Sequence, residues 1–303
     1  MNTRTRIVAA IIFIGILAGC GISLLHNGLY GWTIFALLPG FLGGAVSWSL
    51  RPATGCEAAT VGAVSSVFGA FFLLAIWQEG LICVLMALPL VVPMGALGGW
   101  LLYLFEPSRL RTSSLAMFLL APVSLWLDTT ARPPVFEVKT AIEIAASPEQ
   151  VWNQVIAFPA LPEPHEWYFR AGLAYPQRAR IEGTGIGAVR YCEFSTGPFV
   201  EPIEVWDQPR LIQFRVTDSP PPLREWSPFG DLNPKHLHGY LVSKQGQFRL
   251  TRLANNHTLL EGTTWYQHGL WPAQYWRWWS DAIIHRIHLR VLNHIRELAE
   301  HAA

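Results

Sequence analysis

The stretch GTGIGAVRYCEF, residues 183–194, decides how the second half of the chain folds. Gly183, Gly185 and Ala188 match the G-x-G-x-x-G/A spacing of a dinucleotide-binding loop. Such a loop must open a helix, because the N-terminal amides of that helix hold the pyrophosphate. Residues 189–194 are instead rich in strand-forming side chains. The glycines therefore predict a hairpin turn with positive φ angles, and not a phosphate site.

Further strands are expected on both sides of this turn. Residues 136–147 alternate in part between apolar and polar side chains, which predicts a strand. Ser147 and Gln150 form a capping box that opens a short helix at 147–158. The connections are short, so the strands must pair antiparallel. The other strands are expected at 199–207, 210–218, 243–254 and 257–269. A proline-rich loop at 219–239 separates the first two of these from the last two.

A long amphipathic helix is predicted at 272–302. It is the element able to cover the apolar face of the sheet, so a cavity between sheet and helix is expected. Its apolar residues recur at steps of three or four: Trp276, Trp279, Ile283, Ile287, Val291, Ile295 and Leu298.

The first half of the chain has a different composition. The whole chain is 51% hydrophobic and 14% charged, against about 25% charged in typical soluble proteins. Residues 1–130 are nearly uncharged, which indicates a transmembrane region. A net charge of +1 gives no argument for a nucleic-acid partner. Spans are predicted at 7–25, 29–50, 60–77 and 81–105, with a short, proline-containing fifth at 113–127.

Basic residues set the expected orientation of these spans. Arg4, Arg6, Arg51, Arg109 and Arg111 all fall on one side, which the positive-inside rule makes cytoplasmic. Five spans then put the second half of the chain outside, and four spans leave it in the cytoplasm. We favour five spans, in a bacterial plasma (inner) membrane.

The spans themselves carry little chemistry. The four strong spans contain no Lys, Arg, Asp or Glu, which argues against a transporter or pump. Three prolines, Pro39, Pro89 and Pro93, are expected to kink their helices. Close helix packing is predicted from the small residues Gly40, Gly43, Gly44, Gly95, Gly98 and Gly99.

Candidate catalytic and metal-binding groups are sparse. His236 and His238 form an H-x-H pair that could ligate a metal from one face of a strand, but no Cys or acidic residue nearby in sequence completes the set. His165 beside Glu166 could do acid–base work, although a place in the wall of the cavity mouth is favoured. Neither a metal site nor a cofactor is predicted. Most glutamates on the predicted strands are expected on the solvent face: Glu193, Glu201, Glu204 and Glu261.

The last helix carries a group of basic residues that is expected to form a solvated face: His285, Arg286, His288, His294 and Arg296. The alternative is that these residues contact anionic lipid headgroups.

Five motifs in order resemble the START-like, or SRPBCC, superfamily of polyketide cyclase/dehydrase and lipid-transport proteins. They are IEIAASPEQVWNQVIAF, GTGIGAVRYCEF, EVWDQPRLIQFRV, TLLEGTTWYQ and the terminal helix, and they cover the second half alone. The resemblance implies an α+β helix-grip domain at 136–303. The Pro133-Pro134 pair favours extended backbone, so residues 131–135 are predicted to be a linker from the transmembrane helical bundle at 1–130.

The resemblance also implies a hydrophobic small molecule or lipid as the ligand, held near the bilayer. A binding protein is favoured over an enzyme. A cyclase- or dehydratase-like enzyme and a ligand-sensing structural module remain alternatives. The family has no shared catalytic position that could be assigned to a residue of this sequence. The expected cavity lining is Trp167, Tyr191, Phe214, Phe248, Tyr266, Trp279, Ile283 and Ile287.

Overall fold

The computed structural model describes residues 2–105, 111–228 and 230–301. The chain divides into two compact units. The first holds residues 1–132 together with 225–236 and 270–272, and the second holds 133–224, 237–269 and 273–303. Sequence patterns placed 225–236 and 270–272 in the second domain, so this grouping comes from the folded structure. Arg109 of the predicted basic loop lies outside the described residues.

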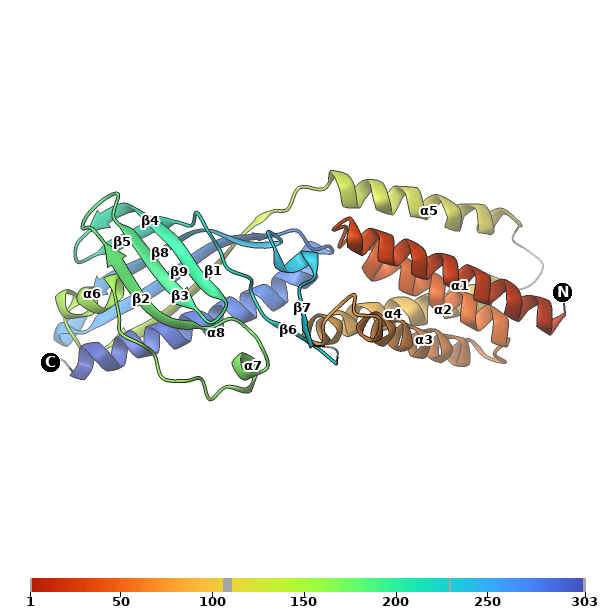
Figure 1. The fold of residues 1–303 in the computed structure, drawn as a ribbon, viewed down its shortest axis with the longest axis horizontal. Helices are drawn as coiled ribbons and strands as arrows, with labels where there is room; N and C mark the ends of the chain where they lie inside the picture. The colour runs from red at the N-terminus through yellow and green to blue at the C-terminus, as the bar shows by residue number, and fades with distance from the viewer. Residues whose placement is uncertain (1, 106–110, 229, 302–303) are drawn as a thin grey trace. The chain divides into compact units, whose positions relative to one another are not determined.

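The first unit is a helical bundle (Figure 1). Four of its helices are long and apolar enough to cross a membrane: α1 (Thr3–His26), η1 with α2 (Thr33–Leu50), α3 (Gly55–Ala75) and α4 (Leu81–Phe105). The fifth predicted span forms a helix, α5 (Arg111–Thr130), that is not among these four. The unit also contains the short elements β6 (Glu225–Ser227), β7 (Gly230–Leu232) and η2 (Lys235–Leu237).

Glycines bring α2, α3 and α4 together, as their spacing predicts. A Cβ atom at Gly43 or Gly62 would collide with the backbone oxygen of Gly95, and one at Gly98 would collide with the backbone of Gly40. Small residues allow this close approach of helix backbones inside a membrane. Pro89 and Pro93 lie inside the continuous α4, whereas Pro39 stands at the start of α2, just after the π-helical turn η1 (Thr33–Leu37).

Thr54 and Asp128 are among the side chains of the first unit that bind the free amides at helix starts. Thr54 caps α3 by accepting a hydrogen bond from the amide of Glu57. Asp128, near the end of α5, accepts hydrogen bonds from the amides of Trp32 at 2.7 Å and Thr33 at 3.0 Å. A Cβ atom at Gly31 would collide with this carboxylate. The C-terminal end of α5 therefore lies at the end of the bundle where α1 stops and α2 begins.

The second unit is a seven-stranded antiparallel sheet with one long helix (Figure 1). The strand order is β1-β9-β8-β5-β4-β3-β2. The helices are α6 (Pro148–Ile156), α7 (Trp167–Arg170) and α8 (Ala273–His301). The strands are β1 (Val135–Ile144), β2 (Pro176–Glu182), β3 (Val189–Phe194), β4 (Gly197–Asp207), β5 (Leu211–Arg215), β8 (Leu241–Arg252) and β9 (Thr258–His268), with the 3-10 turn η3 (Ala254–Asn256) between the last two.

The glycine-rich stretch forms a turn that joins β2 to β3. Gly183, Gly185 and Gly187 have φ angles of 87°, 81° and 89°, a region that side chains with a Cβ rarely adopt. The segment after them is strand β3, so the prediction of a hairpin turn is confirmed.

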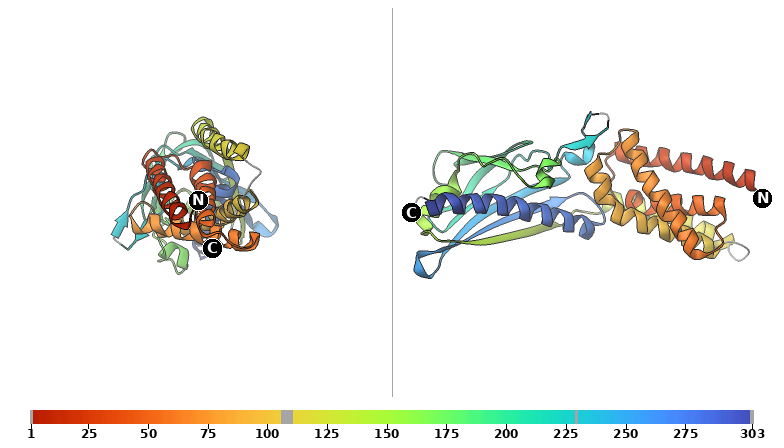
Figure 2. Two further views of the ribbon diagram at one scale, coloured as in Figure 1. Left: turned by 90° about the vertical axis from the view of Figure 1, so that its right-hand side faces the viewer. Right: turned by 90° about the horizontal axis from the view of Figure 1, so that it is seen from below.

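The core of the second unit lies between the sheet and α8, which runs along the strands (Figure 2). Leu292 and Ile295 of α8 are fully buried against the sheet, and Trp152 of α6 is 1% exposed. Ser147 and Gln150 form the predicted capping box of α6. The predicted α+β helix-grip architecture is confirmed.

Candidate functional site

A cavity of about 130 Å³ lies between α8 and the sheet. An engineered apolar cavity of about 150 Å³ holds a benzene molecule, so this space suits a single ring or a short chain. Its walls are mostly apolar side chains from β3, β4, β5, β8 and α8, together with the prolines that follow β5. Several wall residues, including Pro221, Leu241, Ile283 and Ile287, are only half-buried, so solvent reaches this part of the wall.

Four of the eight residues expected to line the cavity do so. Phe214 and Phe248 come from neighbouring strands, and Ile283 and Ile287 come from α8. Alternation along β5 had placed Ile212, Phe214 and Val216 on one face, and Ile212 and Phe214 are indeed buried.

The other four expected residues lie elsewhere. Trp167 on α7 is 77% exposed. Tyr191 points to the opposite face of β3, where the guanidinium of Arg180 stacks over its ring. Tyr266 is fully buried beside Phe136, and Trp279 packs against Trp278. Aromatic character alone therefore did not separate the cavity wall from the rest of the core and the surface.

A buried ion pair forms part of the cavity wall. Arg190 of β3 and Glu201 of β4 stand directly opposite each other in the antiparallel register. Nη1 of Arg190 donates a hydrogen bond to Oε2 of Glu201, and the two side chains are 2% and 8% exposed. The expectation that most strand glutamates lie at the surface holds for exposed Glu204, but it is wrong for Glu201.

Arg190 has donor groups that no described residue binds. Within the described residues, its Nε and Nη2 atoms have no hydrogen-bond partner. Its guanidinium carbon lies 5.6 Å from the ring centres of Phe214 and Phe248 and 5.7 Å from that of Phe158. Aromatic rings at this distance stabilise a cation moderately, but they cannot accept the directed hydrogen bonds of two N–H groups.

Burial shifts the pKa values of the acidic groups here. It raises the pKa of Glu201, although the positive charge of Arg190 acts in the opposite direction. It also raises the pKa of the Cys192 thiol to about 12, so this thiol is protonated at neutral pH and is a poor nucleophile.

His288 is the second polar feature of the cavity. Its Nε2 lies 2.8 Å from the hydroxyl of Thr264, and its Nδ1 lies 3.1 Å from the hydroxyl of Thr140. Burial lowers its pKa to about 4, helped by the nearby charge of His285. The ring is therefore neutral at pH 7, with both nitrogens held by threonine hydroxyls, and it is not part of the solvated basic face expected for α8.

The remaining polar candidates do not line the cavity. His165 is exposed, and Glu166 lies 4.0 Å from Arg290. His236 belongs to η2 and is buried, whereas His238 is exposed, so the expectation that this pair could share one face of a strand is wrong.

The sequence contained a partial signal for Arg190 and Glu201. A charged residue in a strand whose two faces both contain aromatic side chains can point either way. Pairing GTGIGAVRYCEF with the following strand would have placed an arginine opposite a glutamate, but nothing local shows that this pair faces inward.

Comparisons with known proteins find similarity among solved structures alone. No protein-family model matches the chain, and a search of curated proteins finds no match. Among solved structures, norcoclaurine synthase from Thalictrum flavum has 13% identity and a TM-score of 0.37, covering 57% of this chain and 100% of that one. The Zhui aromatase/cyclase from Streptomyces has 17% identity and a TM-score of 0.33, covering 55% of this chain and 96% of that one.

Each of these matches spans little more than half of the present chain. The assignment of fold rests on the second unit's own features: an antiparallel sheet in the order β1-β9-β8-β5-β4-β3-β2, packed against a long C-terminal helix. The chain therefore combines four apolar helices with a unit that has the helix-grip fold.

Proposed function

We propose that the second unit binds a small, mostly apolar molecule that carries an anionic or hydrogen-bond-accepting group, and that the helices of the first unit anchor it in a membrane. The observation that carries this proposal is Arg190. It is a buried cation in the wall of an apolar cavity, and two of its nitrogens have no hydrogen-bond partner among the described residues. Buried polar groups are normally satisfied, so these nitrogens need a partner from a ligand or from water.

The size of the cavity narrows the choice of ligand. At about 130 Å³ it suits a single ring or a short chain. A phospholipid with two acyl chains would require the cavity to widen several-fold. Of the two ligand classes that the sequence suggested, the small hydrophobic molecule is therefore favoured over a whole lipid.

A cyclase- or dehydratase-like enzyme is the second candidate. The observation in its favour is Glu201, a carboxyl group with a raised pKa in the same cavity. Against it, both ring nitrogens of His288 are held by threonine hydroxyls, and no hydrogen bond joins His288 to Glu201 among the described residues. Loss of water from a bound ligand, seen by mass spectrometry and absent in Glu201→Gln, would favour the enzyme.

The position of α5 supports a membrane anchor with five crossings. With 20 residues, α5 is about 30 Å long, close to the thickness of a bilayer core. Its first residue is Arg111, one of the arginines predicted to be cytoplasmic, and it ends with Asp128 beside residues 32 and 33, at the other end of the bundle. This favours a plasma-membrane protein with its N-terminus in the cytoplasm and its helix-grip unit on the outside.

Binding is tested with probes that match in size and differ in charge. Titration of the full-length protein in detergent with benzoate and with benzylamine, followed by calorimetry, should show tighter binding of benzoate. Arg190→Gln should weaken benzoate binding at least tenfold, because a hydrogen bond to a charged group is worth about 1.5–3 kcal/mol. The matched control is Arg178→Gln, which removes an arginine from the exposed pair with Glu193.

Equal binding of the two probes, or benzoate binding unchanged by Arg190→Gln, would refute the proposal. The conservative variant Arg190→Lys guards against a folding defect, because it keeps the charge but loses the planar array of donors. Native mass spectrometry of the full-length protein would then identify the molecule that co-purifies with it.

A further inference from the structure

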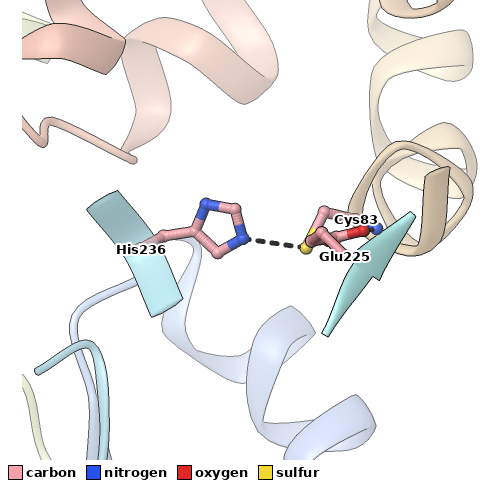
Figure 3. A group of neighbouring side chains, drawn as sticks. All are labelled: Cys83, Glu225 and His236. Atoms are coloured by element: carbon pink, nitrogen blue, oxygen red, sulfur yellow. Dashed lines mark hydrogen bonds between the residues drawn. The ribbon is translucent and has the colours of Figure 1, made fainter. Parts of the chain in front are cut away.

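Three side chains with metal-binding chemistry meet in the first unit: Cys83, Glu225 and His236 (Figure 3). Each offers one ligand atom, and the three atoms lie within 4.8 Å of one another. Sγ of Cys83 and Nε2 of His236 are 2.9 Å apart. Cys83 stands in the first turn of α4, Glu225 begins β6 and His236 lies in η2, so the folded chain brings together residues more than 140 positions apart.

A second carboxylate lies beside the histidine. Oε2 of Glu79 lies 3.4 Å from Nδ1 of His236, on the side of the ring away from Cys83. The ring of Tyr30 packs against His236 edge-on, with centroids 5.0 Å apart. Histidines that bind metals through one ring nitrogen commonly donate the other N–H to a carboxylate, which fixes the tautomer and orientation of the ring. Glu79 is placed for that role, and Nε2 is left facing the cluster.

The cluster is short of positive charge. Glu79 is 7% exposed and Glu225 is 2% exposed. Within the described residues, neither carboxylate forms an ion pair with a lysine or arginine, and Oε1 of Glu79 has no hydrogen-bond partner. Burying carboxylates without a compensating cation is costly. A bound divalent cation would supply that charge.

Helix capping explains part of this arrangement. Oε1 of Glu225 accepts a hydrogen bond from the amide of Cys83 at 3.1 Å, and Oε2 accepts one from the amide of Ile82 at 3.3 Å. A carboxylate at a helix N-terminus is stabilised by these amides and by the helix dipole. A cap accounts for Glu225 alone. It does not account for the thiol and imidazole that converge on the same point, or for the buried Glu79 behind the imidazole.

We propose that Cys83, His236 and Glu225 bind a zinc ion, with Glu79 as the outer carboxylate that holds His236. Thiolate, imidazole and carboxylate are all zinc ligands, whereas magnesium and calcium prefer oxygen atoms alone. The donor atoms of a tetrahedral zinc site lie about 3.3–3.8 Å apart, given bonds of about 2.0–2.3 Å. The Sγ–Nε2 separation of 2.9 Å must therefore widen by several tenths of an ångström.

Such a site would join the start of α4 to the segment 225–236 within the first unit. Three protein ligands leave a fourth coordination position for water or another small ligand. Gly80 makes room for the arrangement, because a Cβ atom there would collide with the Glu225 side chain.

The test uses full-length protein in detergent, stripped with a chelator and then titrated with Zn²⁺ and Co²⁺. We expect one zinc per chain by elemental analysis. Bound Co²⁺ should show the near-ultraviolet absorption of a thiolate-to-cobalt charge transfer. Cys83→Ser should abolish that absorption, and His236→Asn should weaken affinity at least tenfold. Glu79→Gln should weaken affinity about 10–100-fold while the absorption remains.

Matched controls lie close to the site in sequence or share its residue types. His238→Asn changes an exposed histidine two positions from His236, and Cys56→Ser changes an exposed cysteine at the start of α3. Both should bind cobalt like the unaltered protein. Absorption that persists in Cys83→Ser, or metal binding no tighter than that of the Cys83→Ser/His236→Asn double variant, would overturn the proposal.

A measurement on the unaltered sequence covers the case in which a variant does not fold. Zn²⁺ should slow the reaction of Cys83 with maleimide, followed by peptide mass spectrometry, and should leave the rate at Cys56 unchanged. Equal rates at Cys83 with and without Zn²⁺ would count against the site.

Discussion

Arg190 and Glu201 face each other across β3 and β4 with both side chains buried, and they are the charged pair in the wall of the helix-grip cavity. The glutamate satisfies one nitrogen of the guanidinium, and two others have no hydrogen-bond partner among the described residues. The pair therefore has a structural role, since each charge compensates the other, and it leaves donors directed at whatever fills the cavity.

Breaking this pair should destabilise the protein more than removing it entirely. Glu201→Gln leaves Arg190 buried without a counter-charge, which should cost about 3–5 kcal/mol of unfolding free energy. The double variant Arg190→Met/Glu201→Met should lose clearly less, because neither charge remains buried. Equilibrium unfolding in denaturant measures both. If the double variant lost more stability than Glu201→Gln, this account of the pair would be wrong.

Truncating the buried face of α8 should weaken the second unit strongly. Ile295 is fully buried in the core cluster, so Ile295→Ala should cost about 2–5 kcal/mol of unfolding free energy. Glu297→Ala, on the exposed face of the same helix, is the matched control and should change little. Denaturant unfolding followed by tryptophan fluorescence provides the comparison, and similar losses in both variants would contradict the assigned helix face.

Acid should weaken the contribution of His288 to stability. Its pKa is about 4 in the folded protein and about 6.5 in an exposed histidine. The unfolded state therefore binds the proton first as the pH falls. The contribution of His288 to the free energy of unfolding is therefore complete above about pH 6.5 and declines as the pH falls below that value. Below about pH 4 it is lost, which lowers the free energy of unfolding by up to about 3 kcal/mol.

The variant His288→Gln removes this titration. The stability difference between the unaltered protein and His288→Gln should shrink between pH 7 and pH 4, as measured by thermal unfolding at each pH. His165→Gln, at an exposed histidine outside this hydrogen-bond network, is the control. A difference that stays constant over this range would show that His288 is not buried in its neutral form.

Enlarging a glycine at the contact of α2 with α4 should disrupt the bundle. Gly43→Ala would force a methyl group against the backbone of Gly95, and overpacking of this kind costs about 1–3 kcal/mol. Gly19→Ala in α1 is the matched control, because a Cβ atom there meets nothing within 4 Å. Thermal unfolding in detergent should show a lower midpoint for Gly43→Ala alone. An unchanged midpoint would mean that these helices do not pack so closely.

Reporter fusions should show the C-terminus on the outside. In a bacterial host, alkaline phosphatase fused after residue 303 should be active and a fluorescent protein fused there should be dark. The same reporters fused after residue 109 should give the opposite pattern, because Arg109 and Arg111 are predicted to be cytoplasmic. If both positions give the cytoplasmic pattern, α5 does not cross and the chain has four spans.

Local signals were sufficient for most of the second unit. The capping box at Ser147, the glycine turn at 183–187 and the apolar stripe of the last helix each depend on neighbours a few residues away, so they could be read directly. The sequence patterns do not identify strand β2. They also do not predict the short elements β6, β7 and η2 within the proline-rich segment 219–239, because these are too short to show a periodic pattern.

The sequence by itself determined that an apolar helical region precedes an antiparallel sheet and a long amphipathic helix, because hydrophobic periodicity, caps and turns are encoded within short windows. Only the tertiary structure decided that Arg190 and Glu201 face the cavity, and that Cys83, Glu225 and His236 meet in the first unit. The physical reason is distance along the chain. Which face of a strand is buried, and which remote side chains converge, depends on packing between segments far apart in sequence, and no local pattern carries that information.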